Sequence, residues 1–207
     1  MKLVTYVSDG QDRAGILERS AIVDLETAFA WLEHQAGRPS GARDLQERYG
    51  SGVLGFIEHA GEARPAADTL VKMHLDGSLP ATHGGRSLSV PASSVKLVSP
   101  IPRPPSMRDG YAFRQHVETA RRNRGLPMIP EFDLFPIFYF TNHQAVTGPG
   151  DVHVQKLHLD KLDFELEAAV VVGKKARNLS AATADEAIFG MTIMNDFSAR
   201  ARCRWKR

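Results

Sequence analysis

Two glutamates separated by one residue, Glu165 and Glu167, are the strongest chemical signal in this sequence. The apolar segment 163–172 that contains them predicts a β-strand. Side chains two residues apart in a strand point to the same face, so both carboxylates are expected to face one spot. The opposite face is predicted to be core and consists of Phe164, Leu166, Ala168 and Val170.

The face that carries the two carboxylates continues with Ala169 and Val171, which indicates that it is also partly buried. Two like charges on a partly buried strand repel each other and resist desolvation, so they need a cation or a shared proton. Carboxylate oxygens favour Mg²⁺, Ca²⁺ or Mn²⁺ over soft metals. The alternative is a solvated strand end whose glutamates face water, and the pattern alone leaves both open.

Three further residues could complete such a site. Asp196 follows the predicted strand 190–195, where an aspartate serves either as a ligand or as a turn former. Asp109 and His116 lie seven residues apart in a segment, 108–124, that is predicted to be helical, so both would share one helix face. Asp109 is equally suited to cap that helix. His116 is a candidate general base, or an ordinary core or surface histidine.

No other motif suggests a competing chemistry. His143, His153 and His158 lack the spacing of a helical zinc site, and Cys203 has no evident base beside it. The sequence contains no Walker loop, dinucleotide-binding glycine motif or serine-hydrolase elbow. The basic cluster 121–124 favours a solvated helix face, or a surface that meets an anionic substrate.

The elements that must position these residues fall into two parts. The first, residues 1–98, is predicted to be a small α/β or β-barrel-like unit with strands at 2–7, 14–17 and 20–24. Asp24 is expected to cap a helix over 25–32, and a helical region is expected around 54–71, after a polar stretch at 37–50. Four prolines in residues 99–106 predict a linker.

The second part, residues 107–207, is predicted to be β-rich. Besides the helix at 108–124, which Gly125 ends, a short helix is expected at 180–188. Strands are expected at 136–140, 145–147, 163–172 and 190–195. The predicted fold class is therefore α+β.

Composition excludes several classes of protein. The chain has 207 residues, of which 43% are hydrophobic and 24% charged, and it contains no apolar run long enough to span a membrane. A single cysteine and the absence of a signal-peptide core predict a reducing, cytoplasmic location. Residues 200–207 hold five basic side chains and no acidic one, and the rest is mildly acidic, so neither nucleic acid nor membrane is an expected partner.

Taken in order, these motifs resemble the fumarylacetoacetate hydrolase family. The segments that carry the resemblance are Asp109-x₆-His116, Thr147-Gly-Pro-Gly150, Asp163-Phe-Glu-Leu-Glu167 and Gly190-Met-Thr-Ile-Met-Asn-Asp-Phe-Ser-Ala-Arg200. The most specific parts are the Glu-x-Glu and Asn-Asp-x-Ser-Ala-Arg motifs. The resemblance covers about residues 107–200, roughly half of the chain.

The resemblance implies a mixed β-sandwich roll and a metal-dependent hydrolase of carbon–carbon bonds in β-diketo acids of the fumarylacetoacetate or acylpyruvate type. It implies a divalent cation, Mg²⁺ or else Ca²⁺ or Mn²⁺, held by Asp109, Glu165, Glu167 and Asp196. His116 would deprotonate the attacking water, and Tyr139 and Arg124 would bind a small keto-acid substrate. A homodimer is the implied assembly.

The sequence departs from the family where the resemblance stops. The family continues after Ser-Ala-Arg with an aspartate and then a lysine-glycine segment, whereas Ala201 follows Arg200 here. We therefore expect a C-terminally truncated, incomplete roll with open sheet edges, and the basic tail suggests a reading-frame slip or a misplaced end of the gene. The alternatives are a keto-acid decarboxylase, hydratase or isomerase of the same superfamily, and a non-catalytic metal-binding fragment. A small nucleic-acid-binding protein ranks last.

Overall fold

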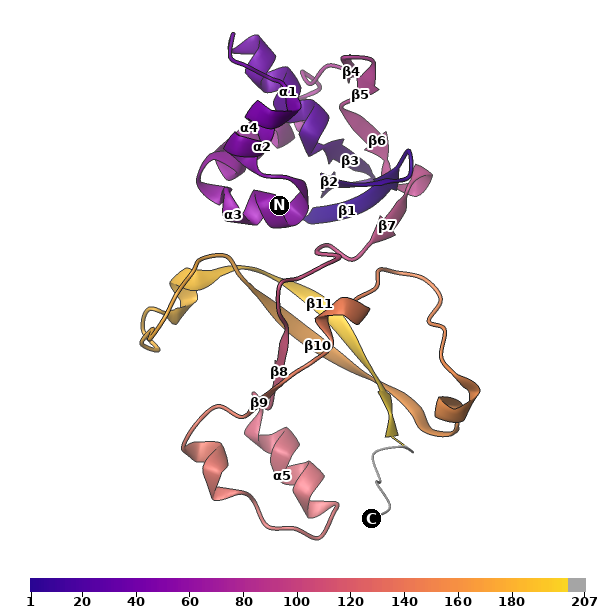
Figure 1. Ribbon diagram of the computed structural model, residues 1–207, viewed down its shortest axis with the longest axis vertical. Helices are drawn as coiled ribbons and strands as arrows, with labels where there is room; N and C mark the ends of the chain where they lie inside the picture. Colours follow the sequence, from indigo (N-terminus) through magenta and orange to yellow (C-terminus); the bar gives the residue numbers. More distant parts are fainter. Residues whose placement is uncertain (201–207) are drawn as a thin grey trace.

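The computed structural model describes residues 1–200, and its first part is built on a five-stranded antiparallel sheet (Figure 1). The strand order is β6-β3-β2-β1-β7. The strands are β1 (Leu3–Ser8), β2 (Gln11–Glu18), β3 (Ala21–Asp24), β6 (Ser89–Pro91) and β7 (Lys96–Val98). Asp9 and Gly10, both with positive φ, form the two-residue turn between β1 and β2, as Asp-Gly does in tight hairpins. The sheet is open, so the described residues do not form a closed barrel.

Four helices close the core of the first part: three of them pack against the sheet, and the second along the chain packs against the other three. They are α1 (Leu25–Gln35), α2 (Ala42–Tyr49), α3 (Gly52–Glu58) and α4 (Ala60–Asp76). Ile16 and Val23 from the sheet are fully buried against Phe56 and Leu70 from the helices. The short strands β4 (Thr82–His83) and β5 (Arg86–Ser87) form a separate hairpin, and a 3₁₀ turn, η1 (Ala92–Ser94), leads into β7.

The predicted N-cap of the first helix is confirmed and belongs to a buried polar network. The Asp24 carboxylate accepts a hydrogen bond from the backbone N–H of Thr27 at 2.8 Å. The Arg13 guanidinium donates to it at 2.7 Å, and the Tyr6 hydroxyl donates to it as well. Burial alone would raise the pKa of Asp24, but these hydrogen bonds outweigh it and hold the pKa below its usual range. The network fixes the start of α1 on the sheet.

The next segment forms a small antiparallel pair with a helix between its strands. β8 (Arg108–Gly110) pairs with β9 (Phe138–Phe140), with Asp109 opposite Tyr139. The connection contains α5 (Arg114–Arg122) and the 3₁₀ turn η2 (Pro130–Asp133). Asp109 therefore lies in a strand and Phe113 precedes the helix, so the prediction of a helix from residue 108 with Asp109 on its face or at its cap was wrong.

A long two-stranded ribbon ends the described chain, with β10 (Leu162–Val172) antiparallel to β11 (Ile188–Ala199) (Figure 1). Both predicted strands are confirmed, but β11 continues past residue 195, so Asp196 lies within the strand and not in a turn. The connections hold only 3₁₀ turns: η3 (His143–Ala145), η4 (Lys156–Lys161) and η5 (Ala184–Ala187). The strand expected at 145–147 was therefore wrong, and the short helix expected at 180–188 is present only as the 3₁₀ turn η5.

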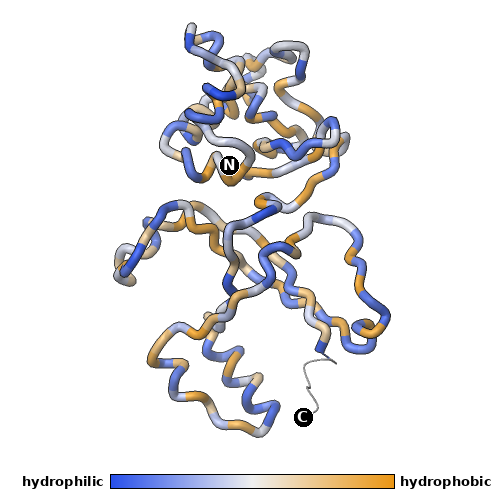
Figure 2. Tube along the Cα trace, viewed as in Figure 1, coloured by the Kyte–Doolittle hydropathy of each residue, from blue (hydrophilic) through white to orange (hydrophobic). Residues whose placement is uncertain are grey.

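The ribbon has one acidic face and one apolar face, and both hydrophobic and hydrophilic residues occur along its two paired strands (Figure 2). The large apolar side chains of the second face are 46–77% exposed. They are Phe164, Leu166, Val170, Val172, Met191, Ile193 and Phe197. This face was predicted to be core, and that prediction was wrong for residues 1–200, because neither a second layer nor a further strand covers the ribbon there.

The base of the ribbon contacts the first part of the chain. The ring of Phe189 meets the ring of Phe56 edge-on, with 6.2 Å between centroids, and the Arg64 guanidinium lies 5.9 Å from the Phe189 centroid. Val171 packs against the same core cluster. The boundary predicted at residues 99–106 stays a prediction, and the basic tail at 201–207 lies outside the described residues. No helix in residues 1–200 has the length and hydrophobicity needed to cross a bilayer.

Candidate metal centre

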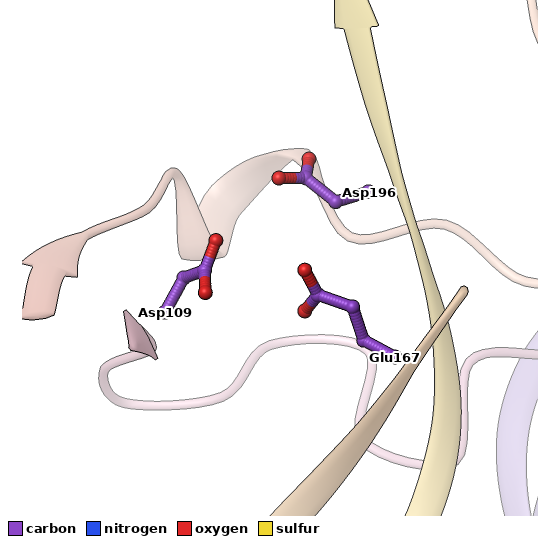
Figure 3. Close-up of side chains that lie close together, drawn as sticks. All are labelled: Asp109, Glu167 and Asp196. Carbon is purple, nitrogen blue, oxygen red and sulfur yellow. The ribbon is translucent and has the colours of Figure 1, made fainter. Parts of the chain in front are cut away.

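Three carboxylates converge from three different strands (Figure 3). Asp109 comes from β8, Glu167 from β10 and Asp196 from β11, and each offers one oxygen that lies within 4.8 Å of the other two. The ribbon register places Glu165 opposite Asp196, so Glu167 is the diagonal neighbour of Asp196 on the same face. The pairing of β8 with β9 supplies the third carboxylate.

The electrostatics of this acidic triad favour a bound cation. All three side chains are half-buried. Burial raises the pKa of Glu167, and the charges of Asp109 and Asp196 raise it further. Burial also raises the pKa of Asp196, followed by the charges of Asp109 and Glu165, while the nearby Tyr139 hydroxyl and Arg200 guanidinium oppose the rise. Clustered oxygen donors that destabilise one another when ionised are suited to a hard divalent cation.

Tyr139, one of the predicted substrate-binding residues, lies at the edge of the acidic triad. Its hydroxyl donates a hydrogen bond to Oδ2 of Asp109, the residue opposite it in the β8–β9 pair. This hydrogen bond and burial raise the pKa of Tyr139, and the nearby charges of the triad add to the rise. The phenol is therefore a neutral proton donor beside the triad.

Glu165, the fourth predicted ligand, lies outside the triad and is bound by an arginine. The Nη2 atom of Arg200 donates to Oε1 of Glu165 at 2.7 Å, and Nε donates to Oδ2 of Asp163 at 2.6 Å. Arg200 lowers the pKa of Asp163 through this hydrogen bond. Sequence reasoning placed neither Asp163 nor Arg200 at the site, although Asp163 shares the face of Glu165 by the same two-residue spacing.

The remaining predicted site residues lie on or just after α5, and neither is among the residues that converge at the triad. His116 is exposed on the helix, with its ring centroid 6.5 Å from that of Tyr111. Arg124 is exposed in the turn that follows, where its backbone N–H donates to the carbonyl of Arg121 at 2.9 Å. Their roles as general base and substrate-binding residue stay predictions.

A sequence model of the family described as the fumarylacetoacetate hydrolase C-terminal domain matches residues 106–207. Through these residues, the chain belongs to the fumarylacetoacetate hydrolase family. The matched segment contains all three carboxylates of the triad.

The chain is similar to several curated proteins. One is a fumarylacetoacetate hydrolase domain-containing protein 2 homolog of Dictyostelium discoideum, which is 31% identical over 111 residues. These residues are 54% of this chain and 34% of that protein. The oxaloacetate tautomerase YisK of Bacillus subtilis is 34% identical over 113 residues, which are 52% of this chain and 35% of YisK. The chain thus spans about a third of the length of these relatives.

Solved structures show the same fold over nearly the whole chain. A maleylpyruvate hydrolase from Sphingobium, solved with manganese(II) and pyruvate, aligns with a TM-score of 0.58 and 19% identity, covering 98% of this chain and 60% of that one. A fumarylacetoacetate hydrolase from Exiguobacterium antarcticum aligns with a TM-score of 0.56 and 19% identity, covering 97% and 57% of the two chains. The α+β fold class expected from the sequence is therefore confirmed.

Proposed function

We propose that the acidic triad binds a divalent cation and that the protein uses it to process β-keto acids. The convergence of Asp109, Glu167 and Asp196 carries this proposal. These half-buried carboxylates raise one another's pKa by charge repulsion, and a hard divalent cation would relieve that repulsion. Mg²⁺ or Mn²⁺ is the proposed metal, with Ca²⁺ as the alternative of the same ligand class. The manganese in the Sphingobium hydrolase structure supports this choice.

The proposed chemistry is hydrolysis of a carbon–carbon bond in an acylpyruvate or fumarylacetoacetate type of substrate. A divalent cation at the triad would supply Lewis acidity to the oxo groups of such a substrate. Tyr139, whose hydroxyl already donates to Asp109, is suited to orient the substrate oxygens beside the triad. We assign to His116 the removal of a proton from water and to Arg124 the binding of the substrate carboxylate.

A second candidate function is keto–enol tautomerisation of oxaloacetate. It is favoured by the 34% identity to an oxaloacetate tautomerase over 113 residues. This reaction needs proton transfer at carbon and oxygen but no water activation, so it would not require His116 as a base. Tyr139 is a neutral phenol beside the triad and is suited to donate a proton to the enol carbon, with the proton of the enol hydroxyl returning to the phenolate.

Turnover assays separate these proposals. The chain would be incubated with Mn²⁺ or Mg²⁺ and either an acylpyruvate, followed by loss of its enol absorbance and release of pyruvate, or enol-oxaloacetate, followed by ketonisation. We expect pyruvate release that stops on chelation and in Glu167→Gln but persists in the charge-matched variant Glu186→Gln. Ketonisation alone would favour the tautomerase. Metal binding without either reaction would favour a metal-binding fragment.

Location and assembly are also proposals. The single cysteine supports a reducing compartment, and we propose the cytoplasm. We propose a homodimer, as the family resemblance implies, and light scattering of the purified chain would test it.

A further inference from the structure

Within residues 1–200, Arg200 is the one basic residue whose side chain lies within hydrogen-bond distance of a predicted metal ligand. Its guanidinium lies on the acidic face of the ribbon. Arg200 follows the last residue of β11, and its side chain reaches back to β10. There it bridges two carboxylates that are neighbours on one strand face, Asp163 and Glu165. This inference rests on the metal site proposed above.

The bridge to Arg200 distinguishes Glu165 from Glu167. Glu165 lies directly opposite Asp196 in the register, closer along the ribbon to that aspartate than the diagonal Glu167. Glu167 nonetheless joins the triad and Glu165 does not. The difference between the two glutamates is that Oε1 of Glu165 accepts a charge-assisted hydrogen bond from Arg200 at 2.7 Å.

We propose that Arg200 competes with the metal for Glu165, so that it holds the fourth carboxylate away from the triad until the cation displaces it. Asp163 is the second anchor of the arginine, bound by Nε at 2.6 Å, and it keeps the guanidinium on this face after Glu165 leaves. Arg200 is thus a positioning residue that acts through Glu165 and tunes metal affinity.

The competition has a defined direction. All three partners are between a third and a half exposed, so solvent screens the ion pairs and the hold on Glu165 is weak enough for a divalent cation to break. Removing the guanidinium frees Glu165 for the cation and thereby tightens metal binding. From the usual strength of exposed ion pairs, we expect a gain in affinity of about three- to ten-fold.

The test is a double-mutant cycle of Mn²⁺ binding followed by calorimetry on the full chain. Arg200→Met is expected to lower the Kd about three- to ten-fold, and Arg200→Lys, which keeps the charge but loses the planar fork, is expected to fall between it and the wild type. Glu165→Gln is expected to raise the Kd. In the Glu165→Gln background, Arg200→Met is expected to change the Kd less than two-fold.

A matched control separates this competition from a general effect of net charge. Arg114 is 48% exposed, compared with 46% for Arg200, and it also bridges two carboxylates, those of Glu118 and Asp133. Arg114→Met is therefore expected to leave the Kd unchanged. Circular dichroism of each metal-free variant would verify the fold.

Three results overturn the inference: weaker or unchanged binding in Arg200→Met, an equal gain in both Glu165 backgrounds, or an equal gain in Arg114→Met. If the wild-type chain binds no Mn²⁺, the proposed metal site itself fails. Binding by the wild type with no coupling between Arg200 and Glu165 refutes the inference alone.

Discussion

Glu167→Gln is expected to stabilise the metal-free protein and to weaken its response to metal, two effects of opposite sign from one substitution. Glu167 faces Asp109 and Asp196, with oxygens within 4.8 Å. At that separation two unit charges repel by about 0.9 kcal/mol in water and by about 3.5 kcal/mol at an effective dielectric constant near 20. Because the side chains are half-buried and screened by salt, we expect a net gain of about 1–2 kcal/mol from removing both repulsions.

Metal stabilises the wild type more than it stabilises the variant. Mn²⁺ at one hundred times its Kd stabilises the wild-type chain by about 2.7 kcal/mol. Loss of one anionic ligand is expected to weaken binding about 30- to 100-fold, so the same Mn²⁺ concentration stabilises Glu167→Gln by less than about 1 kcal/mol. Glu186 is exposed and lies outside the triad, so Glu186→Gln controls for the loss of one negative charge.

Thermal unfolding followed by far-ultraviolet circular dichroism measures both effects at low ionic strength. Metal-free Glu167→Gln is expected to melt about 3–6 °C above the wild type, and Glu186→Gln within about 1 °C of it. With Mn²⁺, the wild type is expected to gain more than Glu167→Gln does. A lower melting temperature of metal-free Glu167→Gln, or an undiminished response to Mn²⁺, would refute the reasoning.

The sign of the pH dependence follows from the raised pKa of Glu167 in the folded chain. A carboxyl group whose folded pKa lies above its unfolded value contributes stability below the unfolded pKa and loses it as pH rises through the folded pKa. The advantage of Glu167→Gln is therefore expected at neutral pH and is expected to vanish below about pH 4, where the wild-type side chain is protonated in both states.

Three other substitutions test separate parts of the structure. Tyr139→Phe removes the hydroxyl that donates to Asp109. It is expected to lower kcat at least about ten-fold while Mn²⁺ affinity stays within about three-fold of the wild type. An unchanged kcat in steady-state assays would exclude a role of the hydroxyl in the reaction. Asp24→Ala breaks a buried ion pair and a helix cap, and is expected to lower the free energy of unfolding by about 3 kcal/mol. The exposed Asp44→Ala is expected to lower it by under about 1 kcal/mol. Similar losses in urea unfolding would contradict a stabilising role of the Asp24 network. Glu33 is fully buried, and its pKa is lowered to about 2 chiefly by the hydrogen bond from Arg38, so its stabilisation is present above about pH 4.5 and lost toward pH 2. The free energy of unfolding of Glu33→Gln is expected to fall less steeply than that of the wild type as the pH is lowered from about 4.5 to 2. An unchanged pH dependence would count against the network around Glu33.

Local patterns were sufficient to predict the elements whose signals lie within a few residues. The helix that starts at Leu25 was predicted from its capping aspartate, and the ribbon strands from their apolar runs. The carboxylates at 165 and 167 were placed on one face by the two-residue period of a strand, which the structure shows.

Long-range pairings could not be predicted in the same way. β8 has only three residues and is defined by β9, about 30 residues later, so the polar segment around Asp109 was predicted as the start of a helix. The contact of Arg200 with Glu165 spans 35 residues and arises from the ribbon register. The apolar ribbon face was predicted as core because alternation reports hydrophobicity and not whether another layer covers it.

The central claim is that Asp109, Glu167 and Asp196 hold a divalent cation. The most direct measurement is anomalous diffraction at the manganese edge from crystals of the chain grown with Mn²⁺. We predict one strong anomalous peak between these three carboxylates, at about 2.1–2.3 Å from an oxygen of each, and no such peak in crystals of Glu167→Gln. A manganese peak elsewhere, or none at the triad, would contradict the account.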